Sequence, residues 1–129
     1  MGKMSRDKGK RGEREVAKLL KQYGYDARRG QQYCGASGDA DVVGLPGVHI
    51  EVKYVECLDV KKALEQAVSD ARKGDIPAVF HKQNRKPLNV IMRTQDFVKF
   101  LTGDEIFIPD LRVTIEFNSF MALYRILRE

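Results

Sequence analysis

The sequence has few cysteines and no long apolar segment, and each of these absences excludes a class of protein. The two cysteines, Cys34 and Cys57, have neither a Cys-x-x-Cys spacing nor a neighbouring histidine, so they form no zinc motif. We interpret both as free thiols. No apolar run approaches the roughly 20 residues of a membrane-spanning helix, and the N-terminus is too polar for a secretion signal. We therefore expect a cytoplasmic protein without a membrane partner.

The charge balance is basic, which favours a polyanionic partner. Lysine and arginine number 23 against 18 acidic residues, which gives a net charge of +5 and a pI near 9.3. This balance does not identify the partner, because ribosomal proteins and many enzymes share it. With 129 residues, 43% of them hydrophobic, the chain suits one domain with a core and is too short for two.

The distribution of basic and apolar residues divides the chain into three segments. Residues 1–11 (MGKMSRDKGKR) contain five basic residues and almost nothing to bury, so we expect a flexible basic arm. We assign residues 12–101 to the core of the domain. Residues 102–129 form a C-terminal extension, which we expect to pack on this core or to form a dimer interface.

Apolar periodicity predicts a mixed α/β domain built around one sheet. Asp59, Thr94 and Asn118 are expected to cap the second, third and fourth helices, because each precedes a segment with helical spacing. The predicted elements are, in order, a helix at 12–23, a strand at 25–29, a hairpin whose strands flank a turn at 45–47, a helix at 60–73, strands at 77–82 and 88–93, a short helix ending at 101, a strand at 111–117 and a terminal helix after 118.

The stretch GDADVVGLPGVHIEVK, residues 38–53, places charged residues in a hairpin that is otherwise apolar. Residues two apart in a strand share a face, so Glu51 and Lys53 project together. A three-residue turn at 45–47 pairs Asp41 with Glu51 and brings their β-carbons to about 5 Å from each other. Two facing carboxylates repel, and a divalent metal ion between them would offset this cost.

Helical phase distinguishes the two glutamates of the first helix. At about 100° per residue, Glu13 lies close to the apolar stripe and points towards the core, whereas Glu15 points towards water. Glu13 can therefore add a third carboxylate, the ligand type that Mg²⁺ and Mn²⁺ favour. Lys53 is placed to hold an attacking water or to neutralise the charge on a phosphate in the transition state. Taken singly, each charged residue also fits an exposed ion pair, and His49, on the same strand face, fits a packed or surface histidine.

These residues resemble the signature of the PD-(D/E)XK nuclease superfamily, which is an Asp on one strand and an acid-X-Lys triplet on the next. ADVVGLPGVHIEVK supplies Asp41 and the triplet Glu51-Val52-Lys53. KGKRGEREVAKLL resembles the opening helix of archaeal Holliday-junction resolvases, in which a Glu at the Glu13 position joins the metal site. EQAVSDARKGDIPAVFHKQNRKPLNVIM resembles small phage-encoded members, so the resemblance covers about residues 8–101.

The resemblance implies a restriction-endonuclease-like α/β core, with a central mixed β-sheet flanked by helices, and a metal-dependent active site. Its cofactor would be Mg²⁺, which Mn²⁺ can replace. By this resemblance the metal ligands are Glu13, Asp41, Glu51 and Val52, and the catalytic residues are Glu13, Asp41, Glu51, Lys53 and Gln66.

Two positions leave alternatives open. Ala40 stands where the superfamily signature has a proline, and Asp39 could take the metal role of Asp41, whose strand face it shares. Asp39 lies nearer the Gly-rich loop, so we rank it second. Gln66 resembles a glutamine that some members place beside the active site, and it fits equally well a polar residue at the edge of a helix face.

The resemblance implies a metal-dependent DNA endonuclease that acts on Holliday junctions or other branched DNA, in the host cytoplasm if the protein is phage-encoded. Resolvases of this kind usually act as symmetric dimers, so we expect a homodimer. One alternative is a nuclease of the same fold with another DNA substrate, used in repair, restriction or packaging. A second is a non-catalytic nucleic-acid-binding module, which clustered acidic residues disfavour because they repel phosphate.

Overall fold

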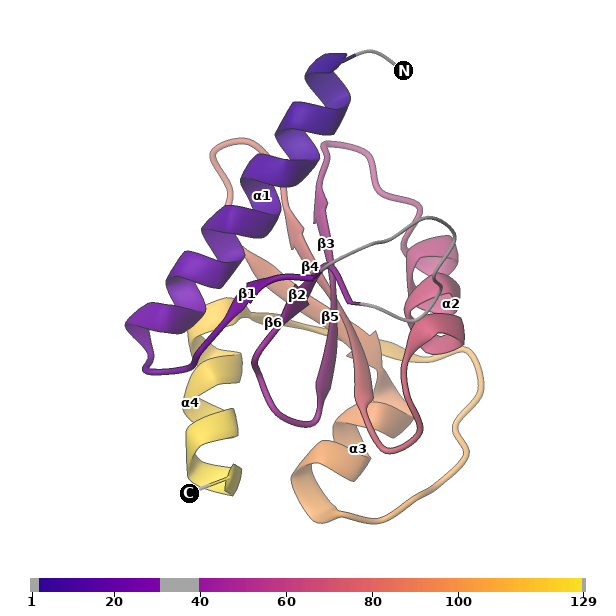
Figure 1. Ribbon diagram of the computed structural model, residues 1–129. Coiled ribbons are helices and arrows are strands. Elements are labelled where there is room, and N and C mark those ends of the chain that lie inside the picture. Colours follow the sequence, from indigo (N-terminus) through magenta and orange to yellow (C-terminus); the bar gives the residue numbers. More distant parts are fainter. Residues whose placement is uncertain (1–2, 31–39, 129) are drawn as a thin grey trace.

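A computed structural model describes residues 3–30 and 40–128 of the chain (Figure 1). No helix in these two ranges is long and apolar enough to cross a membrane. The elements in chain order are α1 (Lys3–Gln22), β1 (Arg28–Arg29), β2 (Val42–Val43), β3 (Val48–Tyr54), α2 (Val60–Asp70), β4 (Ile76–Lys82), β5 (Asn89–Arg93), α3 (Thr94–Thr102), β6 (Arg112–Glu116) and α4 (Phe117–Arg128).

The strands form one six-stranded mixed sheet in the order β1-β2-β3-β4-β5-β6. The β3–β4 pair is parallel and is connected through α2, whereas all other neighbouring pairs are antiparallel. A parallel pair needs such a crossover because the chain must return to the starting edge of the sheet. The predicted α/β fold, with helices flanking a central mixed sheet, is therefore confirmed, and so is the predicted order of elements.

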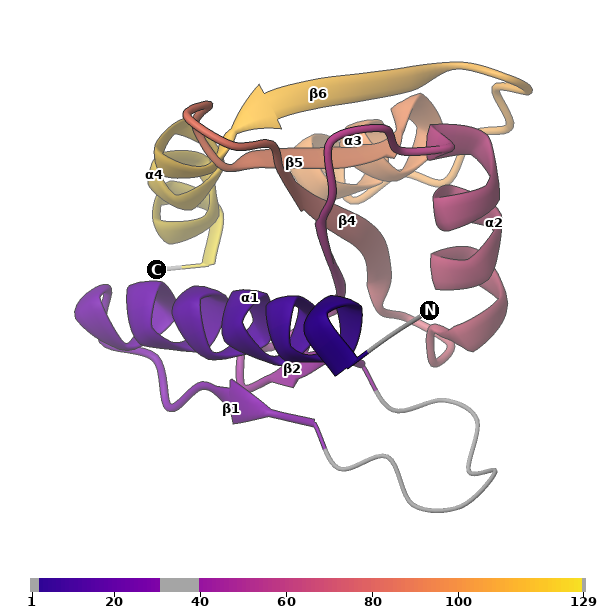
Figure 2. The ribbon, with the colours of Figure 1, turned by 90° about the horizontal axis from the view of Figure 1, so that it is seen from above.

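Helices cover both faces of the sheet (Figures 1 and 2). The main core joins α1, α3 and α4 to one face, where Ile50 and Phe80 are fully buried. A smaller cluster joins α2 to Val79 and Ile91 on the other face. Val79 and Phe80 are adjacent in β4, and adjacent residues of a strand point to opposite faces, so one strand supplies both cores.

Helix α4 packs into the main core and contacts the hairpin turn. Phe117, Phe120 and Tyr124 are buried there, and β6 pairs with β5 along its length. The Tyr124 hydroxyl donates a hydrogen bond of 2.6 Å to the carbonyl oxygen of Pro46. Residues near the C-terminal end thus hold the turn between β2 and β3.

The first helix begins earlier than the sequence predicted. Its start at Lys3 instead of residue 12 places most of the predicted basic arm within a helix. Lysine and arginine have high helix propensity, and residues 1–11 contain no proline to stop the helix. Apolar content indicates whether a segment is buried and not whether it is helical. The low apolar content of residues 1–11 therefore did not predict the helix there.

Of the three predicted helix caps, one is confirmed and two are wrong. The Asp59 side chain accepts a hydrogen bond of 3.1 Å from the Lys62 backbone N–H and caps α2. Thr94 is instead the first residue of α3, after an N-cap at Arg93 that makes no side-chain cap bond. Asn118 lies inside α4, where its side chain accepts a hydrogen bond of 2.7 Å from the Tyr23 hydroxyl. Cys57 is an exposed free thiol, and Cys34 lies outside the described residues.

Gly12 allows α1 to approach β3 closely. A β-carbon built at Gly12 would lie only 2.7 Å from Cγ of Tyr54, the last residue of β3. Gly9, in the same helix, has no neighbouring atom within 4 Å of such a β-carbon. Gly12 is therefore required for packing, whereas Gly9 is a glycine in a helix without a packing role.

We predict opposite effects of alanine at these two glycines. Gly12→Ala should lower the free energy of unfolding by about 1–3 kcal/mol, because the helix or the tyrosine ring must shift. Gly9→Ala should raise it by up to about 1 kcal/mol through helix propensity alone. Urea unfolding followed by circular dichroism measures both. Equal stabilisation by the two substitutions would contradict the close approach.

Candidate active site

The hairpin of β2 and β3 holds Asp41 against the backbone of β3. The predicted register is confirmed at the pair Val42–Ile50. The Asp41 N–H donates to the Ile50 carbonyl at 2.9 Å, and Asp41 Oδ2 accepts the Val52 N–H at 2.8 Å. The carboxylate is thus fixed by a backbone donor of the strand that contains Glu51.

The carboxyl groups of Asp41 and Glu51 lie close enough to interact strongly. The pKa of Asp41 is raised to about 7 from an ordinary 3.8. Burial is the largest cause, and the negative charge of Glu51 and a hydrogen bond between the two carboxyl groups act in the same direction. The charge of Glu13 adds a smaller upward shift of the same pKa, and the Val52 N–H opposes them all. The site therefore concentrates negative charge where water cannot screen it well.

Glu51 has a buried histidine as a direct partner. His49 Nε2 lies 2.8 Å from Glu51 Oε1, and only 3% of His49 and 7% of Glu51 are exposed to solvent. Both residues lie on the same face of β3, as their spacing of two predicts. Sequence reasoning placed His49 on this face but treated it as an ordinary packed or surface histidine. The i, i+2 spacing to Glu51 was the signal for this contact.

Glu13 is partly buried, as its helical phase predicts, and Glu15 is exposed. Glu13 Oε1 accepts a hydrogen bond of 3.0 Å from Nε of Arg29, a residue of β1. Sequence reasoning did not identify Arg29, because the contact joins a helix to a strand and no local pattern announces it. The Glu13 carboxylate therefore lies beside the hairpin with its charge already paired.

Lys53 and Gln66 differ in their relation to the carboxylates. Lys53 is partly buried on the strand face that it shares with Glu51, and no ion pair or hydrogen bond engages its amino group within residues 3–30 and 40–128. Gln66 is exposed on α2, and its side-chain amide donates to Asp70 Oδ2 at 3.2 Å. The structure thus places Lys53 beside Glu51 but shows no contact between Gln66 and the hairpin acids. Asp39 lies outside the described residues.

The donor set fits a divalent metal ion in its chemistry. In the described part of the chain, no three side chains of His, Cys, Asp or Glu are grouped closely enough to hold a metal ion. Asp41 and Glu51 nevertheless supply paired carboxylate oxygens, which Mg²⁺ and Mn²⁺ prefer, and Val52 can offer only its backbone carbonyl oxygen. Burial, followed by the negative charge of Glu51, raises the pKa of Asp41, and a bound cation would stabilise the ionised form of this carboxyl group.

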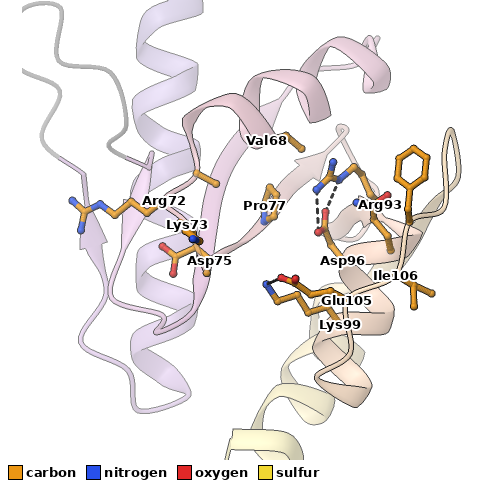
Figure 3. A pocket seen from close by; sticks show the side chains of 14 residues that line it. Val68, Arg72, Lys73, Asp75, Pro77, Arg93, Asp96, Lys99, Glu105 and Ile106 are labelled. Atoms are coloured by element: carbon orange, nitrogen blue, oxygen red, sulfur yellow. Dashed lines mark hydrogen bonds and ion pairs between the residues drawn. The ribbon is translucent and has the colours of Figure 1, made fainter.

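A hollow between α2 and α3 lies apart from these residues (Figure 3). It has a volume of about 540 Å³, and none of the predicted site residues lines it. Its charges are largely paired, since Arg93 contacts Asp96 at 2.7 Å and Lys99 contacts Glu105 at 2.9 Å (Figure 3). The hollow therefore lies outside the predicted site, and its Arg93 and Lys99 are already engaged by acidic residues.

The arrangement of an Asp, an acid-Val-Lys triplet and a helix glutamate agrees with a comparison to known families. The family described as "Phage putative PDDEXK endonuclease" matches residues 4–122. The chain belongs to this family. PDDEXK nucleases typically use divalent metal ions, which agrees with the carboxylate donors of the hairpin.

A solved structure supports the same fold. The chain is similar to Hjc of Archaeoglobus fulgidus, described as a Holliday junction resolvase from an archaeal hyperthermophile. The two share 24% sequence identity with a TM-score of 0.53, over 92% of this chain and 93% of that chain. At this identity the similarity establishes the fold and not the substrate of this PDDEXK family member. No curated protein matches the sequence.

The raised pKa of Asp41 predicts a pH-dependent stability of the metal-free protein. A folded pKa of about 7 against 3.8 means that the fold favours the protonated carboxyl group. This contribution to stability is fully present below the unfolded pKa and is lost as the pH rises through the folded pKa. In EDTA, the difference in melting temperature between Asp41→Asn and the wild type should therefore grow in favour of Asn from about pH 5 to about pH 8.

The comparison with Asp41→Asn isolates this carboxyl group from other titrating residues, because asparagine does not ionise. Differential scanning fluorimetry across the pH range measures the effect. A difference in melting temperature that stays constant with pH would show that Asp41 has an ordinary pKa.

Proposed function

We propose that this protein is a metal-dependent DNA endonuclease whose active site is the β2–β3 hairpin. The single observation that carries the proposal is the pair of strongly interacting carboxyl groups of the half-buried Asp41 and the buried Glu51. Lys53 lies beside them on β3, where no ion pair engages it among the described residues. A non-catalytic binding module has no need for this pair, since buried carboxylates repel phosphate and cost stability. Membership of the PDDEXK endonuclease family supports the same reaction.

The residues of the hairpin have distinct roles in the proposed reaction. Asp41 and Glu51, with the backbone carbonyl of Val52, would hold Mg²⁺ or Mn²⁺, which supplies positive charge for the phosphate and for an activated water. The Val52 N–H fixes one oxygen of Asp41, and His49 contacts one oxygen of Glu51, so both carboxylates are oriented before substrate binds. Lys53 neutralises charge that develops on the phosphate during hydrolysis.

Glu13 and Gln66 have weaker support as residues of the active site. Glu13 influences the pKa of Asp41 but is bound to Arg29, so we assign it a place at the edge of the site as a further carboxylate ligand. Gln66 stays a candidate by family resemblance alone, because its side chain contacts Asp70.

We infer a branched DNA substrate, with a four-way junction as the leading candidate, and a homodimer as the active form. The choice of substrate is supported by the similarity in fold to an archaeal protein that is described as a Holliday junction resolvase. Two active sites related by symmetry could cut opposed strands of a junction. The second candidate is a nuclease of the same fold that acts on other DNA, such as linear duplex.

We predict that Asp41→Asn, Glu51→Gln and Lys53→Ala each lower cleavage by at least about a hundredfold, or about 2.7 kcal/mol of transition-state stabilisation. Each removes a group that holds the cation or neutralises the phosphate, and folding should stay intact. Single-turnover cleavage of labelled DNA in Mg²⁺ measures the rates. Wild-type rates in any one variant would remove that residue from the mechanism.

Helix α1 offers a further test variant, at Glu13, together with a matched control at Glu15. Glu13→Gln should reduce cleavage and weaken Mn²⁺ binding, whereas Glu15→Gln, two residues away and exposed, should change both little. A loss of activity in Glu15→Gln alone would show that the helix presents the other glutamate to the site.

We predict that the wild type cleaves a four-way junction faster than a Y-shaped or linear duplex of the same sequence. A junction presents two strands related by symmetry, which suits two linked active sites. The three substrates are compared at equal concentration, and gel filtration with light scattering gives the oligomeric state. Equal rates on all three would favour a nuclease with a different DNA substrate.

A further inference from the structure

The turn between β4 and β5 is strongly basic. Lys82, Arg85 and Lys86 lie within the segment HKQNRKP, which contains no acidic residue. Arg85 and Lys86 are exposed, and within residues 3–30 and 40–128 none of the three forms an ion pair. The Lys82 amino group donates only to the neighbouring carbonyl of Gln83, at 3.2 Å. Three positive charges thus lie together at this turn without an acidic ion-pair partner among the described residues.

Three hydrogen bonds hold this turn against the segment that follows β3. His81 Nε2 donates to the Val55 carbonyl at 2.9 Å, and Gln83 Nε2 donates to the Glu56 carbonyl at 2.7 Å. The Asn84 N–H donates to Glu56 Oε2 at 2.9 Å. The turn is therefore fixed relative to the end of the strand that contains Glu51 and Lys53.

The turn also lies close to the carboxylate site. Strands β3 and β4 are parallel, and Lys53 pairs with His81 across them. Neighbouring strands lie about 4.8 Å apart, so the turn begins directly beside Lys53. Figure 1 shows the turn, the end of β3 and the first turns of α1 at the same end of the molecule. An open hollow of about 690 Å³ lies here, lined by Glu56, Lys82, Asn84 and Arg85.

We propose that the β4–β5 turn binds the sugar-phosphate backbone of the substrate strand next to the cleaved bond. This inference rests on the proposed function and names the surface that holds the DNA in register with Lys53. DNA carries a phosphate at every nucleotide, so a strand whose one phosphate lies at Lys53 presents the next ones to an adjacent basic surface. The contact is to phosphate and is independent of base sequence.

The one acidic residue of the hollow has a structural role in this arrangement. Glu56 Oε2 accepts the Asn84 N–H, which holds the turn, and its single negative charge is outweighed by Lys82, Arg85 and Lys86. Glu56→Gln keeps a side-chain oxygen as acceptor and removes the charge, so it should leave DNA affinity unchanged or raise it. A tenfold loss of affinity in this variant would contradict the role given to Glu56.

The test removes two charges from the turn and two from a matched control. Arg85 has a left-handed backbone (φ 62°), which asparagine tolerates well, so the turn variant is Arg85→Asn with Lys86→Gln. The control is Lys18→Gln with Lys21→Gln, two exposed residues in the C-terminal half of α1. Fluorescence anisotropy with labelled four-way and linear DNA in EDTA measures binding over a range of salt concentrations, and melting temperatures confirm folding.

We expect the turn variant to bind both DNAs at least about tenfold more weakly at low salt and to lower the slope of log K against log[salt] by roughly two. The control should match the wild type in affinity and slope. If the turn variant also matches the wild type, while the wild type binds and cleaves DNA, the turn proposal is wrong and the proposed function stands. If the wild type binds no DNA, the proposed function itself fails.

Discussion

The carboxyl groups of Asp41 and Glu51 lie side by side where burial and their mutual repulsion raise the pKa of Asp41. Such an arrangement costs stability in the metal-free protein, so the surrounding structure must hold the two groups in place. The Val52 N–H binds one carboxylate and His49 contacts the other. The cost is thus concentrated in one hairpin, and the rest of the fold fixes the position of that hairpin.

Contacts from distant parts of the chain hold the hairpin on several sides. Helix α1 approaches the end of β3 over Gly12, and Arg29 pairs with Glu13 at the outer edge of the sheet. On the inner side β4 lies parallel to β3 and ends in the basic turn. Each contact comes from a different element, so the geometry of the site depends on the whole sheet and not on the hairpin sequence alone.

Local patterns in the sequence predicted much of this structure. The order of the elements, the register at Val42–Ile50 and the cap at Asp59 follow from periodicity and turn chemistry, which act over a few residues. The contacts of Asn118 and Arg29, which were missed, join distant residues. Asn118 accepts a bond from Tyr23 instead of capping a helix, and no local pattern contains that information.

At the candidate site, too, the facing of strand residues could be predicted and a contact between distant elements could not. The facing of Asp41 and Glu51 could be predicted because the two-residue period of a strand fixes it. The pairing of Glu13 with Arg29 could not, since it depends on how a helix lies across a sheet edge. The two-residue period of a strand places His49 and Glu51 on one face, so their contact could have been predicted. The histidine by itself, however, does not show whether its partner is a carboxylate or solvent.

The hydrogen bond from Tyr124 to Pro46 also sets the moment at which the hairpin becomes anchored. The ribosome synthesises the hairpin long before α4, and the two are separated by most of the sheet. A chain interrupted before residue 117 lacks the buried rings of Phe120 and Tyr124, which leaves the main core open and the turn without its anchor. Release of α4 from the ribosome is therefore required before the Tyr124 hydroxyl can hold the turn that joins β2 to β3.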